Sequence, residues 1–307
     1  MTETQTLSDS HSGRMFLLPF RGEFGIKLLR HICRVHAIEH SHKIIVCEKG
    51  DEGLYPTARE FLICAYNVDV EKRDQPIVDK DFIISFLNRE ISPRLNPGDS
   101  VVWPGFEGPR AYFVPQPYLR VEHDIVPDVV ICPRKRAYGS SKNWPHWKLL
   151  VEELLSVGIR NIVAAGAPDS SDRQLENVIP CSWTVTRNLD CTLAWMNSCK
   201  VVVSTDNGLA HLAVWCGKYL LLISHSDGIV APGPVTDQNG NLIKPHYWKI
   251  NLGQFQSENH LKSAIEVAPN SWDDPPSIAK RVTQLIRDSG TTARWQSTQS
   301  VQRAHGV

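Results

Sequence analysis

Short apolar runs alternate along the chain with stretches in which apolar residues recur every three or four positions. Runs of the first kind predict buried β-strands, and the second spacing predicts amphipathic helices. In the first part of the chain this pattern predicts strands at 15–20 and 42–48, helices at 26–38 and 82–89, a glycine-containing turn at 21–25, and short extended segments at 101–104 and 112–115. A strand, a glycine turn, a helix and a second strand in this order are typical of a Rossmann-like unit.

The same alternation starts again near residue 128. It predicts strands at 128–132, 161–165, 182–185, 201–203 and 219–223, and helices at 144–157, 189–197 and 277–289, with loops at 224–260. In the helix at 144–157, Pro145 stands in the first turn and Trp147, Leu150 and Leu154 lie on the core face. We interpret Trp144 and Trp147 as core residues rather than platforms for stacking on a ligand.

Two such series imply an α/β protein with two Rossmann-like domains that face a central cleft. The prolines at 115, 117 and 127 mark the expected hinge between them. The expected divisions are a disordered leader at 1–14, an N-terminal domain at 15–125, a C-terminal domain at 126–290 whose last helix packs there or back on the first domain, and a flexible tail at 291–307. Ligands of such sheets bind at the carboxyl ends of the strands.

The composition of the chain argues against several classes of function. The chain has 33 Lys and Arg against 33 Asp and Glu, so its net charge of zero argues against an extended basic surface for DNA or for an anionic membrane. None of its eight cysteines forms a C-x-x-C pair, which favours reduced core thiols. Without an apolar signal segment or a membrane-spanning run, we expect a cytoplasmic protein, with peripheral association at a membrane left open.

Metal binding finds little support in the sequence. Histidines 31, 36, 40 and 42 lie close together, but neither a cysteine nor a carboxylate completes a zinc set. The expected C-terminal domain at 126–290 also lacks a D-x-D pair, which would hold a metal against a diphosphate. We therefore expect no metal site and no cofactor.

The segment 200–218, KVVVSTDNGLAHLAVWCGK, carries the clearest chemical signal. A strand that turns directly into a helix leaves backbone N–H groups at the helix start, where the helix dipole favours an anion. Gly208 permits close approach of a ligand to the backbone, and His211 lies in the first helical turn. This arrangement predicts a phosphate site formed by the N–H groups of Asn207, Gly208 and Leu209.

An ordered series of motifs surrounds this segment. It consists of Lys142-Asn143-Trp144-Pro145, Gly166 at a strand end, the helix containing Leu193-Ala194, and Asp206-Asn207-Gly208 followed by His211-Leu212-Ala213. The series resembles the K-x-W-P and D-x-G-x-x-H-L-A patterns of the heptosyltransferase-like glycosyltransferases, family nine, of GT-B fold. The resemblance extends over about 128–224, is weak over 15–127 and is absent after 230.

The resemblance implies a donor site for a nucleotide-diphosphate sugar that includes Lys142, Asp206, Asn207, Gly208 and His211. Fixed positive groups at that site would stabilise the negative charge that grows on the departing diphosphate. Other interpretations remain for single residues: Lys142 as a solvated lysine, Asp206 as a helix N-cap, and His211 as a packed histidine.

Two further groups border the expected donor site. Gly166 permits close approach by a nucleoside, and Asp169 or Asp172 could bind ribose hydroxyls. The run Arg134-Lys135-Arg136 departs from the small residues typical of relatives. Arg134 and Arg136 are candidates for phosphate or acceptor contacts, against the alternative of a solvated run of charges.

In the first domain, Arg21-Gly22-Glu23 follows the first strand. Family members carry a Gly-Asp pair at this turn, and Glu23 takes the place of that aspartate. The resemblance thus implies that Glu23 is the general base that removes the acceptor proton, with Arg21 as a further candidate contact. The alternative is a surface glutamate near a helix start.

The predicted activity is an inverting, metal-independent transfer of a hexose or heptose from a nucleotide sugar to a hydroxyl of a glycan, lipid-linked or other acceptor. Three alternatives remain open from the sequence. They are a sugar-nucleotide epimerase of the same architecture, an inactive nucleotide-sugar binding module, and a nucleic-acid base glycosyltransferase, which the neutral charge disfavours.

Overall fold

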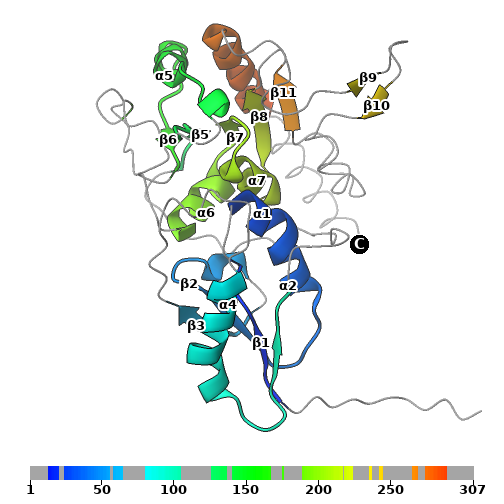
Figure 1. The fold of residues 1–307 in the computed structure, drawn as a ribbon. Helices are drawn as coiled ribbons and strands as arrows, with labels where there is room; N and C mark the ends of the chain where they lie inside the picture. Colours follow the sequence, from blue (N-terminus) through cyan, green and yellow to red (C-terminus); the bar gives the residue numbers. More distant parts are fainter. Residues whose placement is uncertain are drawn as a thin grey trace, which may run out of the picture. The chain divides into compact units, whose positions relative to one another are not determined.

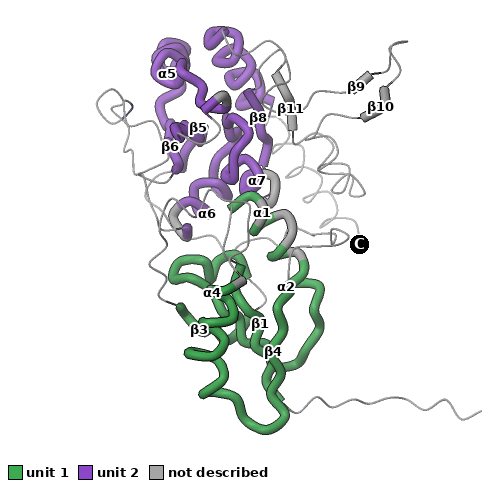
Figure 2. Tube along the Cα trace, viewed as in Figure 1, with its two compact units in different colours: residues 1–113 green, residues 114–307 purple. Residues whose placement is uncertain are grey.

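The chain forms two compact units, residues 1–113 and 114–307 (Figure 1, Figure 2). The coordinates come from a computed structural model. It describes residues 13–20, 24–55, 58–64, 80–104, 126–136, 140–166, 175, 189–216, 218–223, 235–236, 242–244, 265–268 and 274–288.

Unit 1 is built on a parallel sheet in the order β3-β2-β1-β4. Its strands are β1 (Met15–Leu17), β2 (Lys43–Glu48), β3 (Glu60–Cys64) and β4 (Ser100–Val102). Its helical elements are α1 (Phe24–Ile26), η1 (Lys27–Ile32), α2 (Cys33–Ala37), η2 (Glu52–Leu54), α4 (Lys80–Phe86), η3 (Leu87–Ile91) and η4 (Ser92–Arg94). The helix after β1 starts at Phe24, two residues before the expected start, and continues through α1, η1 and α2.

Unit 2 is built on a second parallel sheet in the order β11-β8-β7-β5-β6. Its strands are β5 (Val129–Cys132), β6 (Ile162–Ala164), β7 (Val201–Ser204), β8 (Tyr219–Ile223) and β11 (Ile265–Ala268). Its helical elements are η5 (Ser140–Lys142), α5 (Trp147–Ser156), α6 (Leu189–Ser198), α7 (Gly208–Trp215) and a helix at 275–288. A separate antiparallel pair joins β9 (Val235–Thr236) to β10 (Leu242–Lys244).

The sequence expectations for these elements need four corrections. The pattern missed the strands β3 and β11, and it assigned to loops the segment that holds β9 and β10. Pro145 is exposed and precedes α5 rather than standing in its first turn. The segments expected at 112–115 and 182–185 lie outside the described residues. The α/β class with two parallel sheets is confirmed.

The core of unit 2 explains why its strands read as continuous apolar runs. All four residues of β5 and of β7 are buried, as parallel strands covered on both faces should be. Trp144 and Trp147 are fully buried and meet edge to face at a centroid distance of 5.0 Å, which confirms them as core residues. The helix at 275–288 buries Ile278, Ala279, Val282 and Leu285 in the same core.

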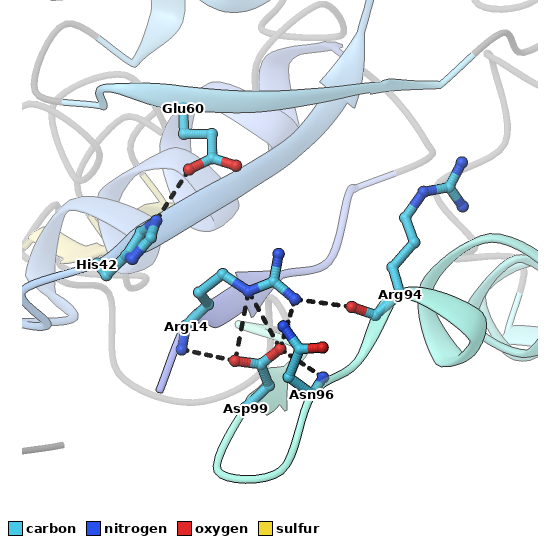
Figure 3. Close-up of polar contacts among 6 residues, drawn as sticks. All are labelled: Arg14, His42, Glu60, Arg94, Asn96 and Asp99. Atoms are coloured by element: carbon cyan, nitrogen blue, oxygen red, sulfur yellow. Dashed lines mark hydrogen bonds and ion pairs between the residues drawn. The ribbon is translucent and has the colours of Figure 1, made fainter. Parts of the chain in front are cut away.

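The amino ends of the unit 1 strands are joined by polar contacts (Figure 3). Asp99 accepts hydrogen bonds from the backbone N–H of Arg14 at 2.8 Å, from its guanidinium at 2.7 Å, and from the N–H of Asn96 at 2.8 Å. The Arg14 guanidinium also donates to the Arg94 carbonyl at 2.7 Å. These hydrogen bonds hold the pKa of Asp99 well below its usual range. The contacts lie at the edge of the sheet opposite to the carboxyl ends, so we assign them to stability.

Candidate functional site

The topology of unit 2 selects one place on its sheet for a ligand. From β5 the chain runs to β6 on one side, and it then returns to β7 on the other side of β5. The strand order therefore reverses between β5 and β7. In open α/β sheets, ligands bind in the crevice outside the carboxyl ends of the strands at such a reversal.

Two expected site residues meet at this reversal. The Lys142 ammonium lies 2.5 Å from the Asp206 carboxylate, although 64 residues separate them. Lys142 belongs to η5, which follows β5, and Asp206 follows β7. The Asp206 side chain is 8% exposed and that of Lys142 is 34% exposed, so the ammonium of Lys142 is the member open to a ligand.

The turn after β7 is fixed by Asn207. Its Oδ1 accepts hydrogen bonds from the N–H groups of Leu209 at 2.8 Å and Ala210 at 3.2 Å, and its Nδ2 donates to Ser204 Oγ at 2.9 Å. These are the bonds of a helix N-cap. The N-cap of α7 is thus Asn207, whereas Asp206 pairs with Lys142.

This geometry corrects the expected phosphate nest. The N–H of Leu209 was expected to face a ligand, but it donates to the side chain of Asn207. Gly208 is the first residue of α7. His211 lies one turn further along the helix and is buried, with 8% of its surface exposed. The start of α7 therefore presents its dipole at the reversal point, next to the ion pair of Lys142 and Asp206.

Asn143 joins described residues of the loop after β5 through its side chain. The Asn143 Oδ1 accepts from the Arg134 guanidinium at 2.5 Å and from the Arg136 N–H at 3.0 Å, and its Nδ2 donates to the Arg136 carbonyl at 2.7 Å. Arg134 is only 7% exposed, while Lys135 is exposed. The interpretation of a solvated run of charges is therefore wrong for Arg134 and holds for Lys135.

The structure describes only one of the remaining residues that the sequence assigned to the expected donor site. Gly166 lies two residues beyond the end of β6, the strand next to β5. Asp169 and Asp172 lie outside the described residues. The nucleoside contacts expected of them stay predictions.

Unit 1 has its own reversal of strand order, between β1 and β4. Arg21 and Glu23, which come after β1 in the sequence, lie outside the described residues. Sequence reasoning missed a buried ion pair of unit 1, between Lys27 of η1 and Asp51, which follows β2. Burial opposes the charge of Lys27, but the carboxylates of Asp51 and Glu48 outweigh it and raise the pKa of the lysine.

Two histidines of unit 1 lie within hydrogen-bonding distance of nearby oxygen atoms. His36 Nε2 lies 3.2 Å from the Leu54 carbonyl, and His42 Nε2 lies 2.8 Å from a Glu60 carboxylate oxygen (Figure 3). Within the described part of the chain, no three His, Cys, Asp or Glu side chains are grouped in a way that could hold a metal ion. No helix among the same residues is long and apolar enough to cross a bilayer.

Comparison with known families decides what this site belongs to. Residues 111–261 match the model of glycosyltransferase family 9 (heptosyltransferase). The chain carries a glycosyltransferase family 9 domain. The match includes β5, Lys142, β7 and Asp206, and it confirms the resemblance drawn from the motifs. The match extends to residue 261, so the expectation that the resemblance is absent after residue 230 was wrong.

Comparisons with solved structures and with curated sequences add less information than the family model does. The chain is similar to a family 9 glycosyl transferase from Veillonella parvula, with 12% identity, 90% of this chain and 97% of that chain covered, and a TM-score of 0.48. It is also similar to the E. coli ADP-heptose lps heptosyltransferase II, with 12% identity, coverages of 90% and 99%, and a TM-score of 0.46. A third is the iron-containing dodecameric glycosyltransferase TibC of enterotoxigenic E. coli H10407, with 13% identity, coverages of 92% and 77%, and a TM-score of 0.41. No curated protein matches the chain.

Sequence reasoning gave no role to Asn143, which bonds to Arg134 and Arg136 in the loop after β5. It occupies the variable position of K-x-W-P, so the motif assigns it no role. A signal was nevertheless present, because an asparagine between a basic loop and a buried tryptophan is a short polar side chain well suited to bond to nearby backbone groups.

Proposed function

We propose that this chain transfers a sugar from a nucleotide-diphosphate donor to an acceptor hydroxyl, with inversion at the anomeric carbon and without a metal ion. The observation that carries the proposal is the ion pair between Lys142 and Asp206 at the reversal of strand order in unit 2. The pair brings together Lys142 of the K-x-W-P motif and Asp206 of the D-x-G-x-x-H-L-A motif, beside the start of α7.

In the proposed donor site, the diphosphate lies at the start of α7 with Lys142 as its closest ammonium. As the bond between the anomeric carbon and the diphosphate oxygen breaks, both bonding electrons stay with that oxygen. Lys142 and the α7 dipole stabilise the added charge. Asp206 holds the ammonium in place from the buried side.

In the proposed acceptor step, Glu23 accepts the hydroxyl proton while the acceptor oxygen forms its bond to the anomeric carbon. Attack from the face opposite the leaving diphosphate inverts the configuration. Glu23 owes this role to the family motif and to its position in the sequence after β1, a strand at the reversal point of unit 1.

Calorimetric titration tests the donor half. The titrants are ADP, UDP, GDP and their sugars, with a heptose donor first because the family model is a heptosyltransferase model. Wild type should bind one nucleoside diphosphate, and Lys142→Gln should weaken that binding at least tenfold, about 1.4 kcal/mol. Lys148→Gln, an exposed lysine on α5, is the matched control and should bind as wild type does. If no nucleotide binds wild type, the proposal is wrong.

Turnover tests the chemical half. With a donor and an acceptor library, proton NMR of the product should show the inverted anomer, and activity should persist in EDTA. Glu23→Gln should lower kcat at least 100-fold with donor affinity unchanged. Formation of an isomer from the donor alone would instead identify an epimerase, and donor binding without any transfer would identify a binding module.

A further inference from the structure

Trp103 stands directly after the last residue of β4, at the carboxyl edge of the unit 1 sheet. In the register of β1 and β4, Leu17 is level with Val102, so Trp103 leaves the sheet beside Leu18. The strand order of unit 1 reverses between these two strands. Trp103 therefore lies at the place where a ligand of an open α/β sheet is expected.

The side chain of Trp103 and the backbone that follows it are both held in place. The side chain packs against the unit 1 core cluster that includes Leu18 and Phe20. Pro104, the next residue, is buried, and its carbonyl accepts a hydrogen bond from the Arg34 guanidinium of α2 at 3.1 Å. A ring held in this way loses little conformational freedom when a ligand binds to it.

The indole of Trp103 offers a ligand carbon surface rather than its polar group. The residue is only half-buried, whereas its ring nitrogen Nε1 is fully buried. The face of an indole carries the negative charge density of its π-system, and the C–H groups along one face of a sugar ring are slightly positive. A sugar ring can therefore stack on such a surface while its hydroxyls stay free at the rim.

The surroundings of Trp103 favour a sugar ring over an alkyl chain. An alkyl chain would need an apolar strip that continues beyond one ring. Among the described residues, none of the large hydrophobic side chains that are strongly exposed lies in β1 or β4 or directly after them; these side chains are Ile63, Ile84, Val126, Leu149 and Val157. Phe20 and Pro104, which do follow the two strands, are buried. One aromatic platform among buried neighbours suits one sugar ring.

We propose that Trp103 is the platform on which unit 1 binds a saccharide acceptor, with one sugar ring of the acceptor stacked on the indole. The proposal rests on the proposed transferase function, and it narrows the acceptor from any hydroxyl to a hydroxyl of a glycan. Stacking binds the acceptor and takes no part in bond breaking. Trp103 should therefore determine the KM for the acceptor, and neither kcat nor the affinity for the donor.

Transfer assays test the proposal with methyl glycosides of hexoses and heptoses as acceptors, and with alkyl alcohols of similar size as non-sugar acceptors. Wild type should use the glycosides. Trp103→Ala should raise the acceptor KM about tenfold, with kcat within about threefold and nucleoside diphosphate affinity within about twofold of wild type. Trp103→Phe keeps an aromatic face and should hold the KM within about threefold of wild type, whereas Trp103→Leu is apolar without being aromatic and should behave as Trp103→Ala does.

The matched control is Leu95→Ala. Leu95 is half-buried against the same core cluster as Trp103, but it precedes β4 in the chain, whereas Trp103 follows it. Its truncation loosens the same core and should leave the acceptor KM within about twofold of wild type. Urea unfolding of each variant verifies that it is folded.

Saturation-transfer NMR gives a readout that needs no turnover. Protons on one face of the glycoside ring should receive saturation from wild type and lose it in Trp103→Ala. An unchanged acceptor KM in Trp103→Ala, a Trp103→Leu variant that matches Trp103→Phe, or equal use of alkyl alcohols would each overturn the proposal and leave the transferase function intact. If wild type binds no nucleotide, the proposed function is wrong, and saturation transfer to the glycoside still decides the role of Trp103.

Discussion

Substitutions of Asn207 separate the folding of α7 from the binding of a diphosphate at its start. Asn207→Ala removes the acceptor of the Leu209 and Ala210 N–H groups and the donor to Ser204 Oγ. Loss of an N-cap costs about 1 kcal/mol, and loss of a further hydrogen bond costs about 0.5–1.5 kcal/mol. We therefore expect unit 2 to lose about 2 kcal/mol. At a typical dependence of about 2 kcal/mol per molar urea, the unfolding midpoint should fall by roughly 1 M.

Asn207→Asp should have the opposite profile. An aspartate keeps the acceptor oxygens of the cap and gains from the helix dipole, so stability should stay within about 1 kcal/mol of wild type. The same carboxylate repels a bound diphosphate. Two like charges about 4 Å apart repel by about 1 kcal/mol with the screening of water and by about 4 kcal/mol near a protein surface. Diphosphate affinity should therefore fall at least fivefold.

The assay combines two measurements on the same variants. Urea unfolding followed by tryptophan fluorescence gives stability, and hydrogen exchange of the α7 amides locates the loss. Titration with the nucleoside diphosphate gives affinity, and Asn88→Asp on η3 of unit 1 serves as the charge control because Asn88 is exposed. Unchanged stability in Asn207→Ala would refute the capping argument. Unchanged affinity in Asn207→Asp would refute the placement of the diphosphate at the start of α7.

Three further predictions concern stability and reactivity. Lys27→Met should lower the free energy of unfolding, measured in urea, by about 3–5 kcal/mol because it leaves Asp51 buried without its partner. The double variant with Asp51→Leu should recover most of that loss, and a loss below about 1 kcal/mol in the single variant would contradict the argument. Burial lowers the pKa of His36, so unit 1 should lose stability as pH falls below about 6.5, the value of an unfolded histidine. Hydrogen bonds from Arg14 and Asn96 lower the pKa of Asp99, so a second loss should follow as pH falls below about 3.9, the value of an unfolded aspartate. His36→Gln should abolish the upper loss and Asp99→Asn the lower one in urea midpoints measured across pH; persistence of either loss would count against the assigned group. Burial raises the pKa of Cys199 to about 12 and also raises that of Cys132. Peptide mapping should therefore find both thiols unlabelled by a thiol reagent until the protein unfolds, and rapid labelling at pH 8 would refute their burial.

The sequence predicted best the elements that are buried on both faces. β5 and β7 are completely buried, so their apolar runs carry the signal of a central parallel strand. The apolar pattern did not reveal β3, because this strand lies at the edge of its sheet, begins with the exposed Glu60 and leaves Ile63 42% exposed. The two residues of β9 and three of β10 are too few for a periodicity to appear.

The sequence named the residues of the proposed donor site but not the contacts between them. The motifs named Lys142 and Asp206 separately, and the pairing of β5 with β7 is what brings them within 2.5 Å. A sequence pattern also cannot say which of two adjacent polar residues caps a helix. Asp206 and Asn207 are both good caps, and the pull of Lys142 on the carboxylate leaves the cap to Asn207.

The charge of the site shows why an average over the chain can mislead. The net charge of zero argues against a large basic surface, and that argument concerns ligands that cover much of a protein. A diphosphate needs only a few cations within a few ångströms. The ten residues 133–142 contain Arg134, Lys135, Arg136 and Lys142 and no acidic residue. We therefore expect the local charge of this segment, rather than the total charge of the chain, to decide whether unit 2 binds an anion.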